Sequence, residues 1–139
     1  MDYRRLLAGV VALAGCAHAY ATPTVARSSA APGTVFDCAK KQLGELGYKQ
    51  SSLDTEALRV NATKVDLNTR RSDTQFRRVL NKLQVEVGAE ADGQTSLKVV
   101  PRTFGEYTTQ RGPTEQEEKP SKDVAADGQR LLEACQSAS

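Results

Sequence analysis

Aromatic residues and histidine are scarce in this 139-residue sequence. It contains no tryptophan, three phenylalanines, four tyrosines and a single histidine, His18. A core without large aromatic side chains must be built from Leu, Val and Ala. One isolated histidine argues against a metal centre or a histidine general base. The small number of aromatic side chains for base stacking, together with a formal net charge of only +2, argues against nucleic-acid binding.

Sequence motifs of catalysis are also missing. No glycine-rich phosphate loop is present, and no serine stands in a nucleophile-elbow context. Glu115, Glu117 and Glu118 cluster in a stretch flanked by prolines. Paired carboxylates need burial before they perform acid–base chemistry, and this stretch is too polar to predict burial. We therefore expect no enzyme, no catalytic or metal-binding residues and no cofactor.

The only long apolar run lies close to the N-terminus. Residues 2–5 form a short basic segment, and residues 6–14 form an uncharged apolar segment, LLAGVVALA. These are the first two parts of an export signal. A membrane-spanning helix needs roughly 20 apolar residues, so this run predicts a cleaved leader over residues 1–15 and not a transmembrane helix.

A cysteine directly follows the leader. Leu13-Ala14-Gly15-Cys16 resembles the lipobox of bacterial lipoproteins. This resemblance implies that a diacylglycerol is attached to the Cys16 thiol and that the leader is cut before it. Ala17, where an Asp commonly retains such proteins at the inner membrane, then implies the outer membrane, facing the periplasm. Ordinary cleavage after Ala17-His18-Ala19 is the alternative.

Two further cysteines remain after Cys16 is assigned to lipid. Cys38 and Cys135 lie 97 residues apart and match no zinc or redox spacing. Export would place them in an oxidising compartment, where a disulfide between them persists. Two unpaired buried thiols are the alternative.

The remainder of the chain divides into a tether and one domain. Residues 16–33 are small, polar and proline-containing, and we interpret them as the lipidated cysteine followed by a flexible tether. Residues 34–139 form the domain. An apolar stripe predicts a helix over residues 35–46, capped by Thr34 and ended by Gly47. A second stripe predicts a helix over residues 122–136, capped by Ser121.

Extended segments lie between the two helices. Alternating apolar residues predict strands over residues 48–53, 57–67, 82–91 and 95–104, with an Asp-Gly turn between the last two and a bulge near Thr63. Residues 76–81 fit a strand or a helical turn, and the polar residues 105–120 are expected to form a loop. The fold class is therefore α+β: an antiparallel sheet of three or four strands, with an N-terminal and a C-terminal helix on one face.

A basic stretch between residues 59 and 82 supplies the one candidate contact surface. Its central residues are Arg70, Arg71, Arg77 and Arg78. They fit contact with anionic headgroups or with an acidic partner, and a solvated strand face is the alternative.

Together these features resemble the small bacterial outer-membrane lipoproteins that have one α+β domain. The expected role is a non-catalytic interaction or structural module that binds an envelope protein or a cell-wall component. A carrier that holds a small apolar ligand or lipid between helices and sheet is the alternative. The sequence leaves the oligomeric state open.

Overall fold

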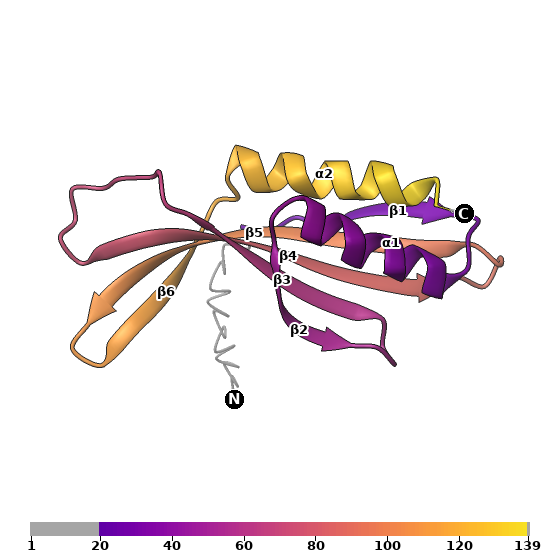
Figure 1. The fold of residues 1–139 in the computed structure, drawn as a ribbon, viewed down its shortest axis with the longest axis horizontal. Coiled ribbons are helices and arrows are strands. Elements are labelled where there is room, and N and C mark those ends of the chain that lie inside the picture. The colour runs from indigo at the N-terminus through magenta and orange to yellow at the C-terminus, as the bar shows by residue number, and fades with distance from the viewer. Residues whose placement is uncertain (1–19, 139) are drawn as a thin grey trace, which may run out of the picture.

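The structure is a computed structural model that describes residues 20–138. The predicted leader, Cys16 and His18 lie outside the described residues. The two helices and six strands of the described chain follow the order β1, α1, β2, β3, β4, β5, β6, α2 (Figure 1). Their bounds are β1 Thr24–Ser28, α1 Pro32–Glu45, β2 Lys49–Asp54, β3 Arg59–Asp66, β4 Phe76–Ala89, β5 Thr95–Thr109, β6 Gly112–Glu118 and α2 Lys122–Gln136.

All six strands belong to one antiparallel sheet. Its order is β1-β5-β4-β3-β2, and β6 also pairs with β5. The long strand β5 has β4 along one edge and shares its other edge between two partners. β1 pairs with residues 95–99 and β6 with residues 103–109. Pro101, which has no amide to donate, lies in the gap between these two segments, as expected for a local sheet edge.

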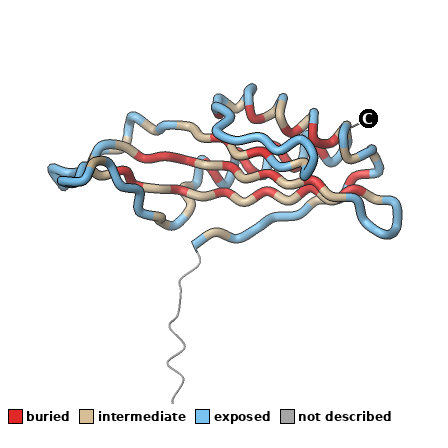
Figure 2. Tube along the Cα trace, turned by 90° about the horizontal axis from the view of Figure 1, so that it is seen from below, coloured by how far each residue is buried: buried red, intermediate tan, exposed pale blue. Residues whose placement is uncertain are grey.

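Both helices cover the same face of the sheet and run antiparallel to each other (Figure 1). Each helix buries one apolar stripe. Buried positions alternate along the central strands, where residues of one parity face the helices (Figure 2). The core between the two layers is mainly aliphatic and includes Val35, Ala39, Leu43, Val60, Leu83, Val85, Leu97, Val99, Val124, Leu131 and Leu132.

Local signals explain most of the helix ends. Ser121 caps α2, with its Oγ accepting a hydrogen bond from the Val124 amide at 3.1 Å. Gly47 follows α1 with φ +86°, a left-handed conformation that favours glycine. The predicted start of α1, residue 35, is three residues late: the helix begins at Pro32, a residue well suited to the first turn, and Thr34 does not cap it.

The sheet has two more strands than the upper limit predicted from sequence. Residues 24–28, predicted to be tether, form β1, and residues 112–118, predicted to be loop, form β6. Both are short strands with mostly exposed side chains, so neither shows apolar alternation in its sequence. Backbone pairing with β5 defines them instead, which a local pattern cannot reveal. The folded unit thus starts before residue 34.

Two details of the strand assignment also change. The bulge predicted near Thr63 does not lie in β3, which pairs with β4 in continuous register from Arg59 to Asp66. The register shift lies on the neighbouring strand β2, between Gln50 and Ser52. Val65 and Leu67 are simply exposed, at 39% and 71%. The segment 76–81, left open between strand and helix, is the first part of β4.

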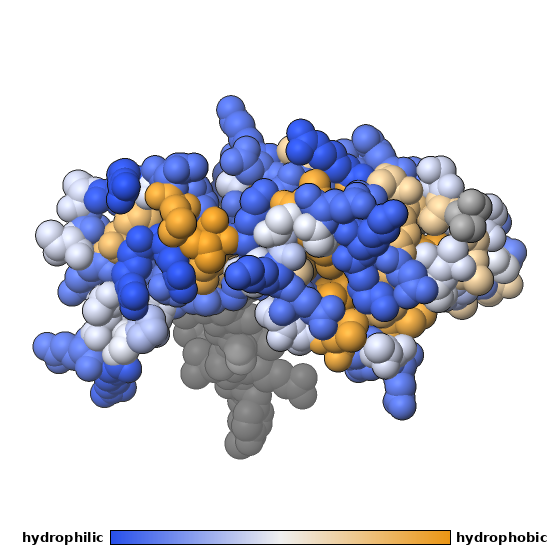
Figure 3. Space-filling model, in the orientation of Figure 1, coloured by the Kyte–Doolittle hydropathy of each residue, from blue (hydrophilic) through white to orange (hydrophobic). Residues whose placement is uncertain are grey.

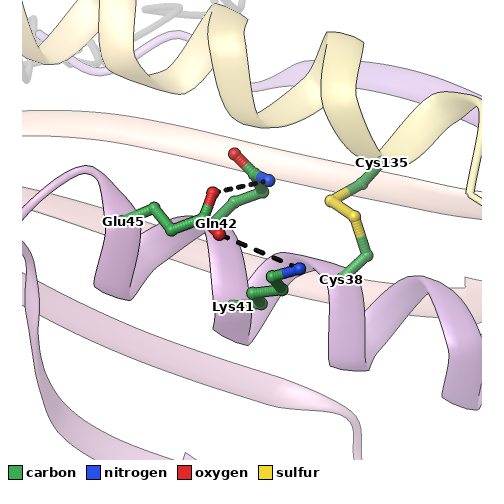
Figure 4. The surroundings of a disulfide bond; sticks show 5 residues. All are labelled: Cys38, Lys41, Gln42, Glu45 and Cys135. Carbon is green, nitrogen blue, oxygen red and sulfur yellow. Dashed lines mark hydrogen bonds and ion pairs between the residues drawn. A yellow bond between two sulfur atoms is a disulfide. The ribbon is translucent and has the colours of Figure 1, made fainter.

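A covalent link joins the two helices. The Sγ atoms of Cys38 on α1 and Cys135 on α2 lie 2.14 Å apart, with their Cα atoms 5.6 Å apart (Figure 4). Cys135 is fully buried and Cys38 packs against the core cluster. The link closes a loop of 97 residues that contains every strand except β1.

We expect removal of this link to destabilise the fold substantially. The double variant Cys38→Ser, Cys135→Ser should lose about 2–4 kcal/mol of unfolding free energy, because the unfolded chain regains loop entropy. Guanidinium unfolding measures the loss. A reductant should shift the midpoint of the wild type and leave that of the double variant in place. An unchanged wild-type midpoint under reductant would contradict the link.

Candidate functional site

A polar pocket lies between the N-terminal half of α2 and the end of β3. Its volume is about 580 Å³. Three of its residues, Asp123, Asp127 and Arg130, share one face of α2 because they follow the helical repeat. β3 and β4 supply Lys64 and Asn81 from the same face of the sheet, where the two residues are cross-strand partners. The pocket therefore brings together three segments: the end of β3 with the residues after it, β4, and α2.

Asp127 is the buried acid of this site, with only 6% of its surface exposed. The Tyr48 hydroxyl donates a hydrogen bond of 2.9 Å to its Oδ2. Lys64 Nζ lies 3.6 Å from the same oxygen, and Arg130 Nη1 lies 3.5 Å from Oδ1. Lys64 also donates a 2.9 Å bond to the carbonyl of Leu46, at the end of α1. These partners offset the cost of burying the carboxylate.

The same contacts fix the protonation state of Tyr48. Burial raises the pKa of its hydroxyl far above the ordinary value of 10.0, and the hydrogen bond to Asp127 raises it further. The phenol consequently stays protonated and acts as a permanent donor. It holds Asp127 in place and is unsuited to proton transfer near neutral pH.

Asn81 connects the sheet to the start of α2. Its side-chain Oδ1 accepts hydrogen bonds from Thr103 Oγ1 at 2.8 Å and from Ser121 Oγ at 3.0 Å. The Ser121 amide in turn donates to Thr103 Oγ1 at 2.9 Å. This network fixes the first turn of α2, and with it the pocket wall, against β4 and β5.

The four arginines of the predicted basic surface have different surroundings. Arg71 forms a bidentate ion pair with Glu118, in which Nη2 and Oε2 lie 2.7 Å apart. Its Nη1 also donates a hydrogen bond to the Tyr107 hydroxyl. Arg78 Nε and Arg77 Nε lie 3.1 and 3.7 Å from the largely buried Glu106. Of these four arginines, only Arg70 forms no ion pair with another described residue, so most of this positive charge is already offset.

Gly105 makes room for one of these pairs. A Cβ atom at this position would lie 2.6 Å from Glu118 Oε1 and 2.8 Å from the Tyr107 ring. Contacts that short do not occur, so a larger residue would displace the Arg71–Glu118 pair from the strand surface.

The acidic cluster was expected in a loop but lies on β6. Glu115 pairs with Lys82 at 2.7 Å and Glu117 with Arg102 at 2.8 Å, on the sheet face opposite the helices. The hydrogen bond from Arg102 holds the pKa of the Glu117 carboxyl below its usual range. Phe104 lies between the two cations, 4.5 Å from Lys82 Nζ and 5.3 Å from the Arg102 guanidinium. Both carboxylates thus pair with cations of β4 and β5.

Among residues 20–138, no group of three His, Cys, Asp or Glu side chains is arranged to hold a metal ion. Neither helix in this range is long and apolar enough to cross a bilayer. A second hollow, of about 360 Å³, surrounds Glu86 on the open face of the sheet, where Arg59 and Lys98 pair with that carboxylate.

Comparison with known proteins does not assign the chain. No protein-family model matches it, and a search of curated proteins finds no match.

Sequence reasoning missed the residues of the polar pocket. Asp123, Asp127 and Arg130 share a helix face, which is a readable signal, but Lys64 and Asn81 lie within strands that show only alternation. Tyr48 and Asp127 are 79 residues apart. Their contact depends on where α2 docks, which follows from the tertiary fold and not from a local motif.

We expect Tyr48→Phe to lower stability at neutral pH by about 1–3 kcal/mol, because Asp127 loses a buried hydrogen bond. The folded state raises the pKa of Tyr48, so this stability is complete below pH 10.0 and declines as the pH rises beyond that value. The difference between wild type and variant should therefore shrink in alkali. Denaturant unfolding at several pH values measures it, with Tyr20→Phe, an exposed position, as control. A difference that stays constant from pH 8 to 11 would refute this assignment.

Proposed function

We propose that this protein is a bacterial envelope lipoprotein whose folded domain has a binding role and no catalytic one. Cys16 carries the lipid, and the domain faces the periplasm from the outer membrane. The partner is an envelope protein or a cell-wall component.

The observation that supports the anchor most is the pairing of the other two cysteines. The sequence has three cysteines, and Cys38 and Cys135 lie at bonding distance from each other. Cys16 is then left over, at the position that resembles a lipobox. A link of this kind persists in an oxidising compartment, which agrees with export. The two inferences thus support each other.

The surface of the domain supports a binding role. On the face shown in Figure 3, hydrophilic side chains surround small, separate apolar patches. The buried carboxylates of Asp127 and Glu106 are held by cations. The layer between helices and sheet, where a carrier would hold an apolar ligand, is occupied by aliphatic side chains. We therefore favour an interaction module over a carrier.

Strand β1 limits how far the domain can lie from its anchor. Cys16 precedes the first residue of β1, Thr24, by eight positions. A fully extended chain of that length spans about 27 Å, roughly half the reach of a tether that ended at residue 33. The proposed anchor would therefore hold the sheet edge near β1 close to the membrane surface.

Mass spectrometry of the protein isolated from its native membrane tests this proposal. We expect a mature chain that begins at Cys16 and carries fatty acyl groups. Cys16→Ala should release the protein from membranes on washing with salt, because a stable anchor requires at least two acyl chains. Ser29→Ala serves as a control in an exposed segment. A native protein that retains its leader, or that begins at residue 20 without lipid, would overturn the proposal.

A further inference from the structure

The side chain of Asn81 is oriented toward the polar pocket. Only 5% of the residue is exposed. Its Oδ1 is occupied by the hydroxyls of Thr103 and Ser121, which sets the orientation of the amide. In the described chain its Nδ2 group donates to no protein atom, and no fully buried side-chain nitrogen or oxygen lacks a partner. Since Asn81 lines the pocket, the Nδ2 group is the part that reaches into it.

The opposite wall supplies a hydrogen-bond acceptor. Asp123, one turn before Asp127 on α2, lines the pocket and forms no ion pair or side-chain hydrogen bond with another described residue. Asp127 is already committed to Tyr48, Lys64 and Arg130. The pocket therefore has free N–H donors on the sheet side and a free carboxylate on the helix side.

Charge and chemistry narrow the class of ligand. Three carboxylates and two cations line the pocket, so a small anion meets net repulsion. A bare metal ion is disfavoured, because Asn81 presents N–H groups and no described cluster fits a metal. A purely apolar ligand would leave the polar lining unpaired. A ligand that both donates and accepts hydrogen bonds without carrying charge satisfies the two walls.

Hydroxyl groups have this property, since each hydroxyl donates one hydrogen bond and accepts up to two. Ala126 and the 71%-exposed Leu67 add an apolar rim to the pocket, suited to the C–H face of a sugar ring. The volume of about 580 Å³ lies within the range typical of small-molecule sites. The geometry points to a binding site for an uncharged, polyhydroxylated ligand, namely a sugar unit of a glycan.

This inference deepens the proposed binding role and rests on it for the cellular source of the glycan. The pocket itself does not depend on the lipid anchor. Binding can therefore be measured on any folded preparation of the full chain, and its outcome is independent of whether Cys16 is acylated.

Saturation-transfer NMR and calorimetric titration of the purified full chain test the site. The probes are two uncharged disaccharides, chitobiose and maltose, with glucuronate as an anionic control and glycylglycine as a zwitterionic control. We expect a disaccharide to bind and both controls to bind more weakly. Preference for chitobiose would indicate an amino-sugar polymer of the cell wall, and preference for maltose a hexose glycan.

Two adjacent positions on α2 offer a matched pair of variants. Ala125 and Ala126 are both exposed, but only Ala126 lines the pocket. Ala126→Tyr should fill the pocket and weaken sugar binding by at least about tenfold, while Ala125→Tyr should bind as the wild type does. Asp123→Asn should weaken binding about tenfold, the size expected for a hydrogen bond to a charged group.

Three results would overturn the proposal. The first is that neither disaccharide binds. The second is that glucuronate or glycylglycine binds more tightly than both disaccharides. The third is that Ala125→Tyr and Ala126→Tyr weaken sugar binding equally, which would place the sugar elsewhere on the molecule.

Discussion

The fold depends on covering one face of a wide antiparallel sheet with two helices. The apolar stripe of either helix alone is too narrow to shield the alternating Val and Leu side chains of the three central strands. Antiparallel packing of α1 and α2 closes this layer, and the Cys38–Cys135 link holds the two helices together. Tyr48, Asp127 and Lys64 then form a polar contact at the end of the same layer, between the end of α1, α2 and β3. Covalent, apolar and polar contacts thus act on the same pair of helices.

Oppositely charged side chains of the sheet pair with each other across its strands. The sequence is basic between residues 59 and 82 and acidic near residue 117, which suggests a molecule with two charged ends. Folding brings these segments within reach of each other, because β4 and β6 pair with opposite edges of β5. Lys82 then pairs with Glu115 and Arg71 with Glu118, and Arg102 of β5 pairs with Glu117. Exposed pairs of this kind contribute little individually, but they remove the large charged patches that the sequence implies.

The parts of the fold that could be predicted are those encoded by neighbouring residues. α2 was predicted from residue 122 to 136 because Ser121 caps it and its stripe is continuous. The central strands were predicted because one of their faces is buried. β1 and β6 lack such a face and are defined by β5, so no local pattern reveals them. The pocket is harder still: Asn81 resembles an ordinary strand residue, and its role emerges only where β4, β5 and the start of α2 meet.

Strand β1 stands apart from the rest of the sheet in one mechanical respect. It precedes Cys38 and therefore lies outside the covalently closed segment from 38 to 135. Tension transmitted through a membrane anchor at the N-terminus would load the β1–β5 ladder first. If that ladder opened, the chain would lengthen only up to Cys38, and the cross-link would prevent further extension of the segment that it closes. An attached domain of this design yields under load at its first strand and the start of α1, while the segment between the two cysteines remains intact.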